Sequence, residues 1–308
     1  MRLYIAGTNG LGNYLEPVLF QNTAGGGVDE MRLYLAATHG PGGRCLQGEL
    51  FCDSITRART QNRTCSEKLT GGGSLQEGLA GRCNILESYY YIADWQTINL
   101  HRFKRFLLDS GAFTALYGAG MDAKSLPSYV DRYIRYIVEN DVKDFFEMDV
   151  DSVVGYKRVL EFRREIEAQT GRRCIPVWHL ERGKKAFQEM CSEYPYVAIG
   201  GIATKAGRKK LKPYLRWFTR EAHRLCAKVH GLGYTELKSL PSIGFDSVDS
   251  TAWLYGNRGG CIYTFDGVAI GKVNAPKGHR LKTREAVVHN FTEWLRYAEY
   301  LEANDKER

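Results

Sequence analysis

Short apolar runs alternate with longer amphipathic stretches over most of the chain after residue 88. Each apolar run is only a few residues long and lacks strict alternation, which is typical of strands buried on both faces. The runs are 106–108, 145–148, 174–178, 196–199, 228–230 and 243–245, with 261–265 as a further candidate. The stretches between them predict helices, because apolar residues share one helical face within 129–138, 153–166, 215–229 and 287–301.

Alternating strands and helices predict an α/β protein whose parallel sheet is covered by helices. Seven such runs and one strand from the N-terminus make eight, the number in a (β/α)8 barrel of the TIM type. An open doubly wound sheet is the alternative. It is disfavoured because Gly7-Thr8-Asn9-Gly10, after the first apolar run, does not match the G-x-G-x-x-G turn of dinucleotide-binding proteins.

The first 83 residues differ from the rest. Residues 1–10 and 31–40 are identical at seven of ten positions, which indicates a local duplication or an alternative start at Met31, and either copy could supply the first strand. Residues 41–83 are rich in glycine and polar residues and predict a long loop or insertion. We therefore divide the chain into N-terminal strands (1–40), a glycine-rich insertion (41–83) and a barrel body with a C-terminal helix (84–308).

The insertion carries four of the eight cysteines, namely Cys45, Cys52, Cys65 and Cys83. Their spacings are wider than the close pairs of most zinc sites, so free thiols are the first expectation and zinc the alternative. Cysteines without a disulfide-type spacing favour a reducing compartment, the cytoplasm, or the host cytoplasm if a phage encodes the chain. No signal peptide is expected at the N-terminus, and no apolar run is long enough to predict a membrane span.

Composition and charge narrow the function further. The chain has 308 residues, 44% of them hydrophobic and 25% charged, which excludes wholesale disorder. Its formal net charge is +8, and residues 101–308 carry all of the excess. Basic residues gather in 205–220, which contains no acid, and again in 272–284. Such clusters favour a polyanion such as nucleic acid as the partner, with a solvated helix face as the alternative.

Polar residues or glycines follow almost every apolar run. They are Asp109, Asp149, His179, Gly200-Gly201, His230-Gly231 and the segment 246–251. In a barrel these residues converge at one mouth. Carboxylates beside glycine-bared backbone suit recognition of a planar hydrogen-bonding ligand and acid–base or nucleophilic chemistry. Each residue alone also has a structural explanation, since aspartates cap helices, glycines make tight turns and a lone histidine often bonds within a core.

Several motifs in order resemble one enzyme family. Leu108–Phe113 resembles the DSGGF-type motif of the tRNA-guanine transglycosylases, and Ala198–Ile202 resembles their GGL motif. The resemblance is closer to the phage-encoded DNA guanine transglycosylases (DpdA type). The segments that carry this likeness are 84–92, 109–115, 228–233 and 247–253, and the resemblance covers about residues 85–265.

This resemblance implies an enzyme that replaces guanine in DNA with a 7-deazaguanine derivative such as preQ0. Asp249 would be the nucleophile, with Asp246 as the alternative, and Asp109 would move the proton. The base would meet Asp149, His179, Gly200, Gly201, His230 and Gly231. Phosphates would meet Lys205, Arg208, Lys209, Lys210, Lys277, Arg280 and Lys282. The resemblance implies no metal in the active site and no cofactor.

One departure from the tRNA enzymes bears on the substrate. Those enzymes carry a cysteine-rich zinc subdomain after the nucleophile, whereas here only Cys261 follows residue 249. DNA is therefore the expected partner. A tRNA-directed transglycosylase and a non-catalytic nucleic-acid-binding barrel remain the alternatives.

Overall fold

A computed structural model describes residues 1–8, 11–20, 79–234, 236, 239–254, 260–275 and 282–305. The chain divides into two compact units. The first contains residues 1–10 and 83–250, and the second contains residues 11–82 and 251–308. We describe each unit by itself.

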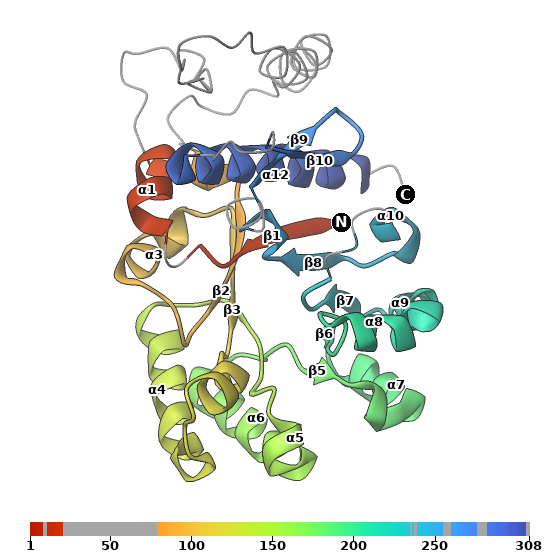
Figure 1. Ribbon diagram of the computed structural model, residues 1–308. Helices are drawn as coiled ribbons and strands as arrows, with labels where there is room; N and C mark the ends of the chain where they lie inside the picture. The colour runs from red at the N-terminus through yellow and green to blue at the C-terminus, as the bar shows by residue number, and fades with distance from the viewer. Residues whose placement is uncertain are drawn as a thin grey trace, which may run out of the picture. The chain divides into compact units, whose positions relative to one another are not determined.

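The first unit is built on an eight-stranded parallel sheet with the order β4-β3-β2-β1-β8-β7-β6-β5 (Figure 1). The strands are β1 (Arg2–Ala6), β2 (Asn84–Ser88), β3 (Arg105–Asp109), β4 (Asp144–Phe145), β5 (Val177–Trp178), β6 (Tyr196–Ile199), β7 (Lys228–Gly231) and β8 (Ser247–Ser250). The first strand pairs with both the second and the last, with Ile5 opposite Ile85 and Leu3 opposite Val248. The chain therefore returns to its starting strand after one passage around the sheet.

The sheet is curled around a single core. Its inward side chains form one buried cluster of Tyr4, Ala6, Leu86, Leu107, Phe146, Ile175, Val177 and Ala198. This cluster joins residues next to β4 and β5, which stand at opposite ends of the strand order. A parallel bridge pairs Phe146 with Ile175, and the Glu147 N–H donates to the Ile175 carbonyl at 3.1 Å. The predicted α/β class with eight parallel strands is confirmed, but the sheet is a curled half-barrel and not a closed barrel, because the segments beside β4 and β5 pair only through this single bridge.

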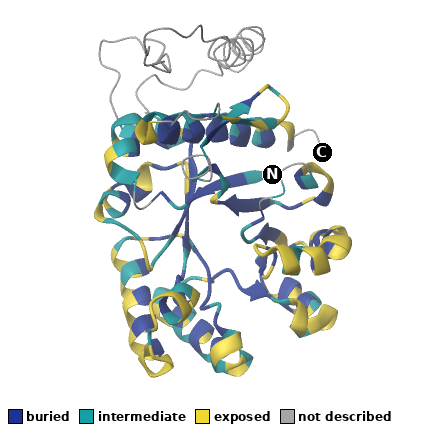
Figure 2. Cartoon of the chain, viewed as in Figure 1, coloured by how far each residue is buried: buried dark blue, intermediate teal, exposed yellow. Residues whose placement is uncertain are grey.

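Helices cover the outside of the sheet, with buried inner and exposed outer faces (Figure 2). They are α3 (Asp94–Asn99), α4 (Leu126–Glu139), α5 (Asp151–Val154), α6 (Tyr156–Thr170), α7 (Gly183–Glu193), α8 (Lys205–Leu211), α9 (Leu215–Arg224) and α10 (Leu240–Ile243). In α4 the buried residues recur at helical spacing, as the pattern of 129–138 predicts. Two of its tyrosines also bond to the sheet, since the Tyr133 hydroxyl donates to the Phe146 carbonyl at 2.9 Å and Tyr129 to that of Ser110 at 2.7 Å.

The second unit contains a hairpin and a long helix. Its described elements are α1 (Gly12–Phe20), η2 (Leu79–Arg82), η9 (Ala252–Leu254), the antiparallel strands β9 (Cys261–Phe265) and β10 (Ile270–Asn274), and α12 (Thr283–Asp305). Two buried side chains of α12 bond to β9. Asn290 accepts the Tyr263 N–H at 2.8 Å, and Glu293 accepts the Phe265 N–H at 2.7 Å. These bonds satisfy backbone donors that β10 leaves unpaired.

Two predicted strands are wrong, and two strands of the sheet were not predicted. Residues 261–265 do form a strand, but it pairs with β10 and not with the main sheet. Residues 243–245 are not a strand, because α10 ends at Ile243 and β8 begins at Ser247. Two strands of the sheet were not predicted, Ser247–Ser250 and Asn84–Ser88, and in the second three of the five residues are polar. The first copy of the N-terminal repeat supplies β1, and the second lies outside the described residues.

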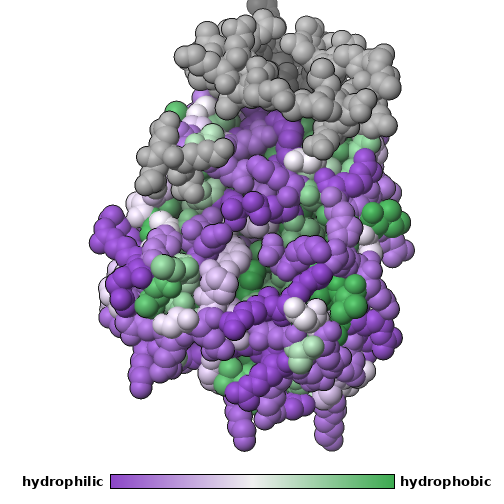
Figure 3. Space-filling view, turned by 180° about the vertical axis from the view of Figure 1, so that it is seen from behind, coloured by the Kyte–Doolittle hydropathy of each residue, from purple (hydrophilic) through white to green (hydrophobic). Residues whose placement is uncertain are grey.

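The surface shows no single large apolar face in the view of Figure 3, where hydrophilic residues predominate and the hydrophobic patches are small and separate. Patches of this kind are ordinary on protein surfaces. None of the described helices is both long and apolar enough to cross a membrane.

Candidate active site

The alternation of side chains along the strands carries several polar residues to one end of the curled sheet. Leu107 of β3 and Val177 of β5 belong to the inner core. Since strand side chains alternate between faces, the residues two positions later face the same side. These are Asp109, the last residue of β3, and His179, directly after β5. Both lie at the carboxyl ends of parallel strands, as predicted.

Asp109 is a partly buried carboxyl group with an unusual proton affinity. Burial, together with the charges of Asp149 and Asp249, raises the pKa of its carboxyl group to about 7, although the hydrogen bond from the Gly111 N–H lowers it. That N–H donates to Asp109 Oδ2 at 3.0 Å. The coupling brings all three predicted aspartates into one electrostatic group. A carboxyl group that titrates near neutral pH can both accept and return a proton.

Asp249 is held at one oxygen. Its side chain is 10% exposed, and Oδ1 accepts the Gly233 N–H at 2.5 Å. The Nε2 atom of His230 lies 3.2 Å from the same oxygen. No described residue hydrogen-bonds to Oδ2. Asp249 is therefore fixed in orientation while its second oxygen keeps its lone pairs for another atom.

Asp246, the alternative nucleophile, lies at the other end of β8. It directly precedes the first residue of that strand, and its Oδ2 accepts the Val229 N–H at 2.7 Å. His223 Nε2 of α9 lies 2.8 Å from the same oxygen. Because β8 is parallel to its neighbours, its amino end is remote from the carboxyl end that carries Asp249. The arrangement favours Asp249 over Asp246 as a member of the site.

Asp149 and His179 form a pair beside two glycines. His179 Nε2 lies 2.6 Å from Asp149 Oδ1. Burial alone would lower the pKa of His179, but the hydrogen bond and charge of Asp149 raise it above its ordinary value. A Cβ atom on Gly200 would lie 2.5 Å from His179 Cε1, so only glycine fits there. Gly201 has a φ of +74°, a conformation that also favours glycine.

Two ion pairs lie on the segments that carry Asp149 and His179. Arg182 Nη2 contacts Asp151 Oδ2 at 2.7 Å, and Arg163 Nε contacts the buried Glu147 Oε2 at 2.7 Å. Glu147 Oε1 also accepts the Val177 N–H at 2.6 Å, which links the segment after β4 to β5. These bonds fix the two strand ends that carry Asp149 and His179.

The same region contains the one group of described side chains that could hold a metal ion. Donor atoms of Asp149, Asp151 and His179 all lie within 4.8 Å of one another. However, Arg182 already supplies a positive partner to Asp151, and its charge would oppose a cation bound there. The arrangement therefore favours hydrogen bonding over metal binding.

Two predicted base-contacting residues lie elsewhere than expected. His230 is fully buried beneath Asp249, among the rings of Tyr4 and Phe146. Gly231 is also buried, and a Cβ atom there would lie 2.9 Å from the Phe245 ring. His230 thus contacts Asp249 rather than an open surface, and Gly231 is required for packing.

Of the residues predicted to bind phosphates, the five that the structure describes separate into three groups. Lys205, Lys209 and Lys210 are exposed on α8. Arg208 is less available to bind a phosphate, because its Nη1 already donates to the Ile202 and Ala203 carbonyls at 3.0 and 2.9 Å. These bonds hold the loop after β6. Lys282, in the second unit, is exposed and lies 3.1 Å from Glu285.

The remaining predicted residues can be placed only in part. Lys277, Arg280, Cys45, Cys52 and Cys65 lie outside the described residues. Cys83 is buried directly before β2.

Exposed aromatic rings next to the site were not predicted. Phe113 and Tyr117 follow β3 and are each 57% exposed, and their ring centroids lie 4.5 Å apart. Tyr90 and Tyr91 follow β2 and are 38% and 51% exposed. The tyrosine run after Ser88 and the phenylalanine four residues after Asp109 are the signals that could have identified them. Exposed rings beside a polar site offer stacking surfaces for flat ligands.

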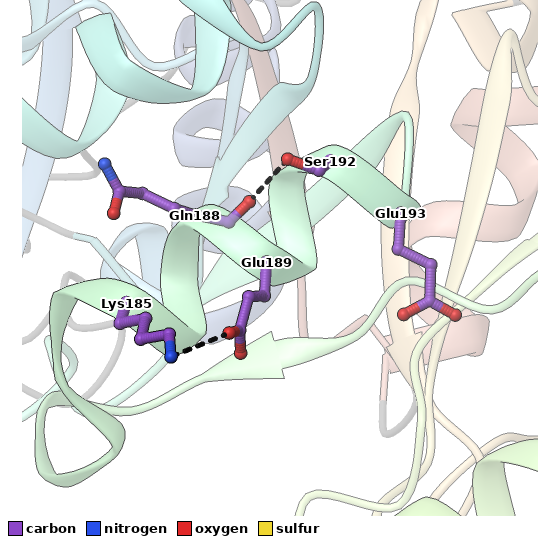
Figure 4. Close-up of a pocket in the computed structure, with 5 residues that line it drawn as sticks. All are labelled: Lys185, Gln188, Glu189, Ser192 and Glu193. Carbon is purple, nitrogen blue, oxygen red and sulfur yellow. Dashed lines mark hydrogen bonds and ion pairs between the residues drawn. The ribbon is translucent and has the colours of Figure 1, made fainter.

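A surface pocket lies elsewhere, on α7 (Figure 4). It is lined by Lys185, Gln188, Glu189, Ser192 and Glu193. Lys185 and Glu189 form an exposed ion pair at 3.8 Å. None of the residues of the candidate active site lines this pocket.

Comparison of the sequence with protein-family models gives no match, and no curated protein sequence matches it either.

Proposed function

We propose that the chain is a DNA base-exchange enzyme that replaces guanine with a 7-deazaguanine derivative such as preQ0. The observation that carries the proposal is the electrostatic group of Asp109, Asp149 and Asp249 at the carboxyl ends of parallel strands. A double displacement needs a nucleophile and a group that moves a proton. Asp249 is anchored through one oxygen, which suits the nucleophile, and Asp109 has a pKa of about 7, which suits proton transfer. The sequence motifs supply the substrate class.

The reaction is a double displacement with retention at the sugar. Asp249 Oδ2 attacks C1′ of the target deoxyguanosine, the C1′–N9 bond breaks, and its electron pair leaves with guanine. An aspartyl–sugar ester then holds the DNA strand while the bases exchange. The incoming base attacks C1′ through N9, and the ester bond breaks to regenerate the Asp249 carboxylate.

Asp109 moves the proton in both halves. In its protonated form it delivers a proton to the departing guanine, and the resulting carboxylate removes the N9 proton of the incoming base. A pKa near 7 suits both directions, because both forms are populated at neutral pH.

The base is recognised by hydrogen bonds at its edge and by stacking. Asp149 accepts from the N1–H and the exocyclic amine, while His179 and the backbone at Gly200-Gly201 meet O6. The raised pKa of His179 favours a donor there. The exposed ring of Phe113 supplies a stacking face.

DNA must present the target base outside the helical stack, because its C1′ and edge are otherwise covered. The exposed lysines of α8 bind phosphates and supply affinity without reading sequence. The proposal includes a (β/α)8 fold of the TIM type, supported by the bridge between Phe146 and Ile175. It places the reaction at the carboxyl face that TIM barrels use.

Exchange of a labelled base tests the function. Purified protein is incubated with radiolabelled preQ0 or guanine and with either duplex DNA, single-stranded DNA or tRNA. Label entering DNA but not tRNA is expected, and Asp246→Asn should retain the activity. Label entering tRNA alone would identify the RNA-directed alternative, and label entering neither nucleic acid would contradict the proposal.

A further inference from the structure

A line of hydrogen bonds runs through the interior of the sheet and ends at Asp249. Tyr196 of β6, His230 of β7 and Ser247 of β8 all face inward. The Tyr196 hydroxyl bonds to Ser247 Oγ, which lies 2.7 Å from His230 Nδ1. The other ring nitrogen of His230 lies 3.2 Å from Asp249 Oδ1. Three adjacent strands thus contribute to one buried chain.

The donors in this chain can be assigned by elimination. The Gly233 N–H can only donate, so Asp249 Oδ1 is an acceptor. In the carboxylate form that the proposed reaction requires, Asp249 can only accept, so His230 Nε2 carries the proton that faces this oxygen. A neutral imidazole has one donor and one acceptor, so Nδ1 accepts the Ser247 hydroxyl. Ser247 Oγ in turn accepts a hydrogen bond from the Tyr196 hydroxyl.

The surroundings agree with this direction. Burial raises the pKa of the Tyr196 hydroxyl well above its ordinary value, so this group keeps its proton and remains a donor. His230 is fully buried, and the rings of Phe146 and Tyr4 lie 5.3 and 6.0 Å from it. Rings packed on the imidazole restrict its rotation. Each of the four side chains in this hydrogen-bonded series has a partner, as buried polar groups require.

We propose that His230, oriented by Ser247 and Tyr196, is a positioning residue that fixes Asp249 through an Nε2–H donor and thereby directs Oδ2 toward the sugar. This role rests on the proposed function, because it concerns the nucleophile of that reaction. The aligned dipoles of Tyr196, Ser247 and His230 all point toward the Asp249 carboxylate. They stabilise it in the orientation in which Oδ1 is occupied and Oδ2 is not.

The tautomer can be measured without any activity. NMR of protein labelled with ¹⁵N-histidine distinguishes the Nε2–H, Nδ1–H and doubly protonated forms by their nitrogen shifts. His230→Gln identifies the signal among the seven histidines. An Nε2–H tautomer at neutral pH is expected, and Ser247→Ala should shift the Nδ1 resonance. An Nδ1–H or doubly protonated ring would overturn the assignment, even if the protein proved to have another function.

The kinetic test uses two substitutions at one position. His230→Leu removes the donor and should slow adduct formation ~10–10²-fold in single turnover, with little change in KM, because one hydrogen bond to a charged group is lost. His230→Gln offers an amide N–H near the former Nε2 and should recover most of the rate. His223→Gln is the matched control, since it alters the histidine–aspartate pair at the other end of β8. A folded His230→Leu variant with the wild-type adduct rate would overturn the role. Absence of any adduct from the wild type would instead contradict the proposed function.

Discussion

Glu87 offers a test of the buried electrostatics that does not depend on activity. Its side chain is 1% exposed, and Oε1 accepts the Thr8 N–H at 2.7 Å as well as the Thr8 hydroxyl. Gln96 Nε2 donates to that hydroxyl oxygen at 2.9 Å. Burial raises the pKa of Glu87 from 4.5 to about 7, although these hydrogen bonds lower it. The folded protein therefore holds a proton on Glu87 at pH values where the unfolded chain releases it.

The sign of the effect follows from this difference. The stability contributed by the tightly held proton is complete below pH 4.5 and is lost as the pH rises through 7. Since one pKa unit corresponds to about 1.4 kcal/mol, the full loss is about 3 kcal/mol, and most of it falls between pH 5 and 8. In Glu87→Gln the amide oxygen can still accept from Thr8, but no charge has to form in the core. We therefore expect the free energy of unfolding of wild type to fall by about 2–3 kcal/mol relative to this variant over that range.

Urea unfolding of both proteins at pH 5, 6, 7 and 8 measures this difference. Glu189→Gln is the matched control, because Glu189 is exposed on α7 and its substitution changes no buried charge. A Glu87→Gln curve that stays parallel to wild type across the four pH values would refute the reasoning, since Glu87 would then titrate alike in both states.

Three further predictions concern the site and its support. Asp109→Asn should lower the exchange rate ~10²–10⁴-fold, and the wild-type rate of the second displacement should rise with pH through about 7 as Asp109 ionises, a dependence the variant should lack. Replacing Lys205, Lys209 and Lys210 with alanine should reduce the slope of log K for DNA against log salt by about 2–3, equally for all sequences, if each lysine contacts a phosphate; an unchanged slope in filter binding would place DNA elsewhere. Glu147→Gln should destabilise the protein by about 3–5 kcal/mol in urea unfolding, because Arg163 is left buried without its charge partner. A double variant that also carries Arg163→Met should recover most of that loss. Equal stability of the single and double variants would contradict this account.

The strands that could be predicted from the sequence are those whose buried residues are apolar. The runs near β3 to β7 are apolar and separated by amphipathic stretches, so their order was evident. The strand Asn84–Ser88 was missed because Glu87 is buried through its bonds to Thr8, which in turn accepts from Gln96, and no local pattern reveals these partners. The end of the sheet was misplaced for a similar reason. In β8 the inward residues Ser247 and Asp249 are polar and are satisfied by β7, whereas the more apolar 243–245 leads to a turn.

The site, too, was predicted from the sequence only in part. Asp109, Asp149 and His179 were predicted because polar residues at strand ends meet in a parallel sheet. Asp249 was chosen over Asp246 by the family resemblance, since the strand expected before them, 243–245, is not formed. The roles of His230 and Arg208 were not predicted, because each depends on a partner that the sequence does not identify. His230 is turned inward to Asp249, and Arg208 folds back on the loop after β6.

Trapping the covalent intermediate tests the central claim most directly. Wild-type protein, Asp249→Asn and Asp246→Asn are each incubated with a DNA duplex and quenched under denaturing conditions, and the adduct is located by mass spectrometry of the digested protein. We predict a sugar–peptide ester on Asp249 in wild type and Asp246→Asn, and none in Asp249→Asn, which should remain folded and bind DNA. An adduct on Asp246, or one that persists in Asp249→Asn, would contradict the account.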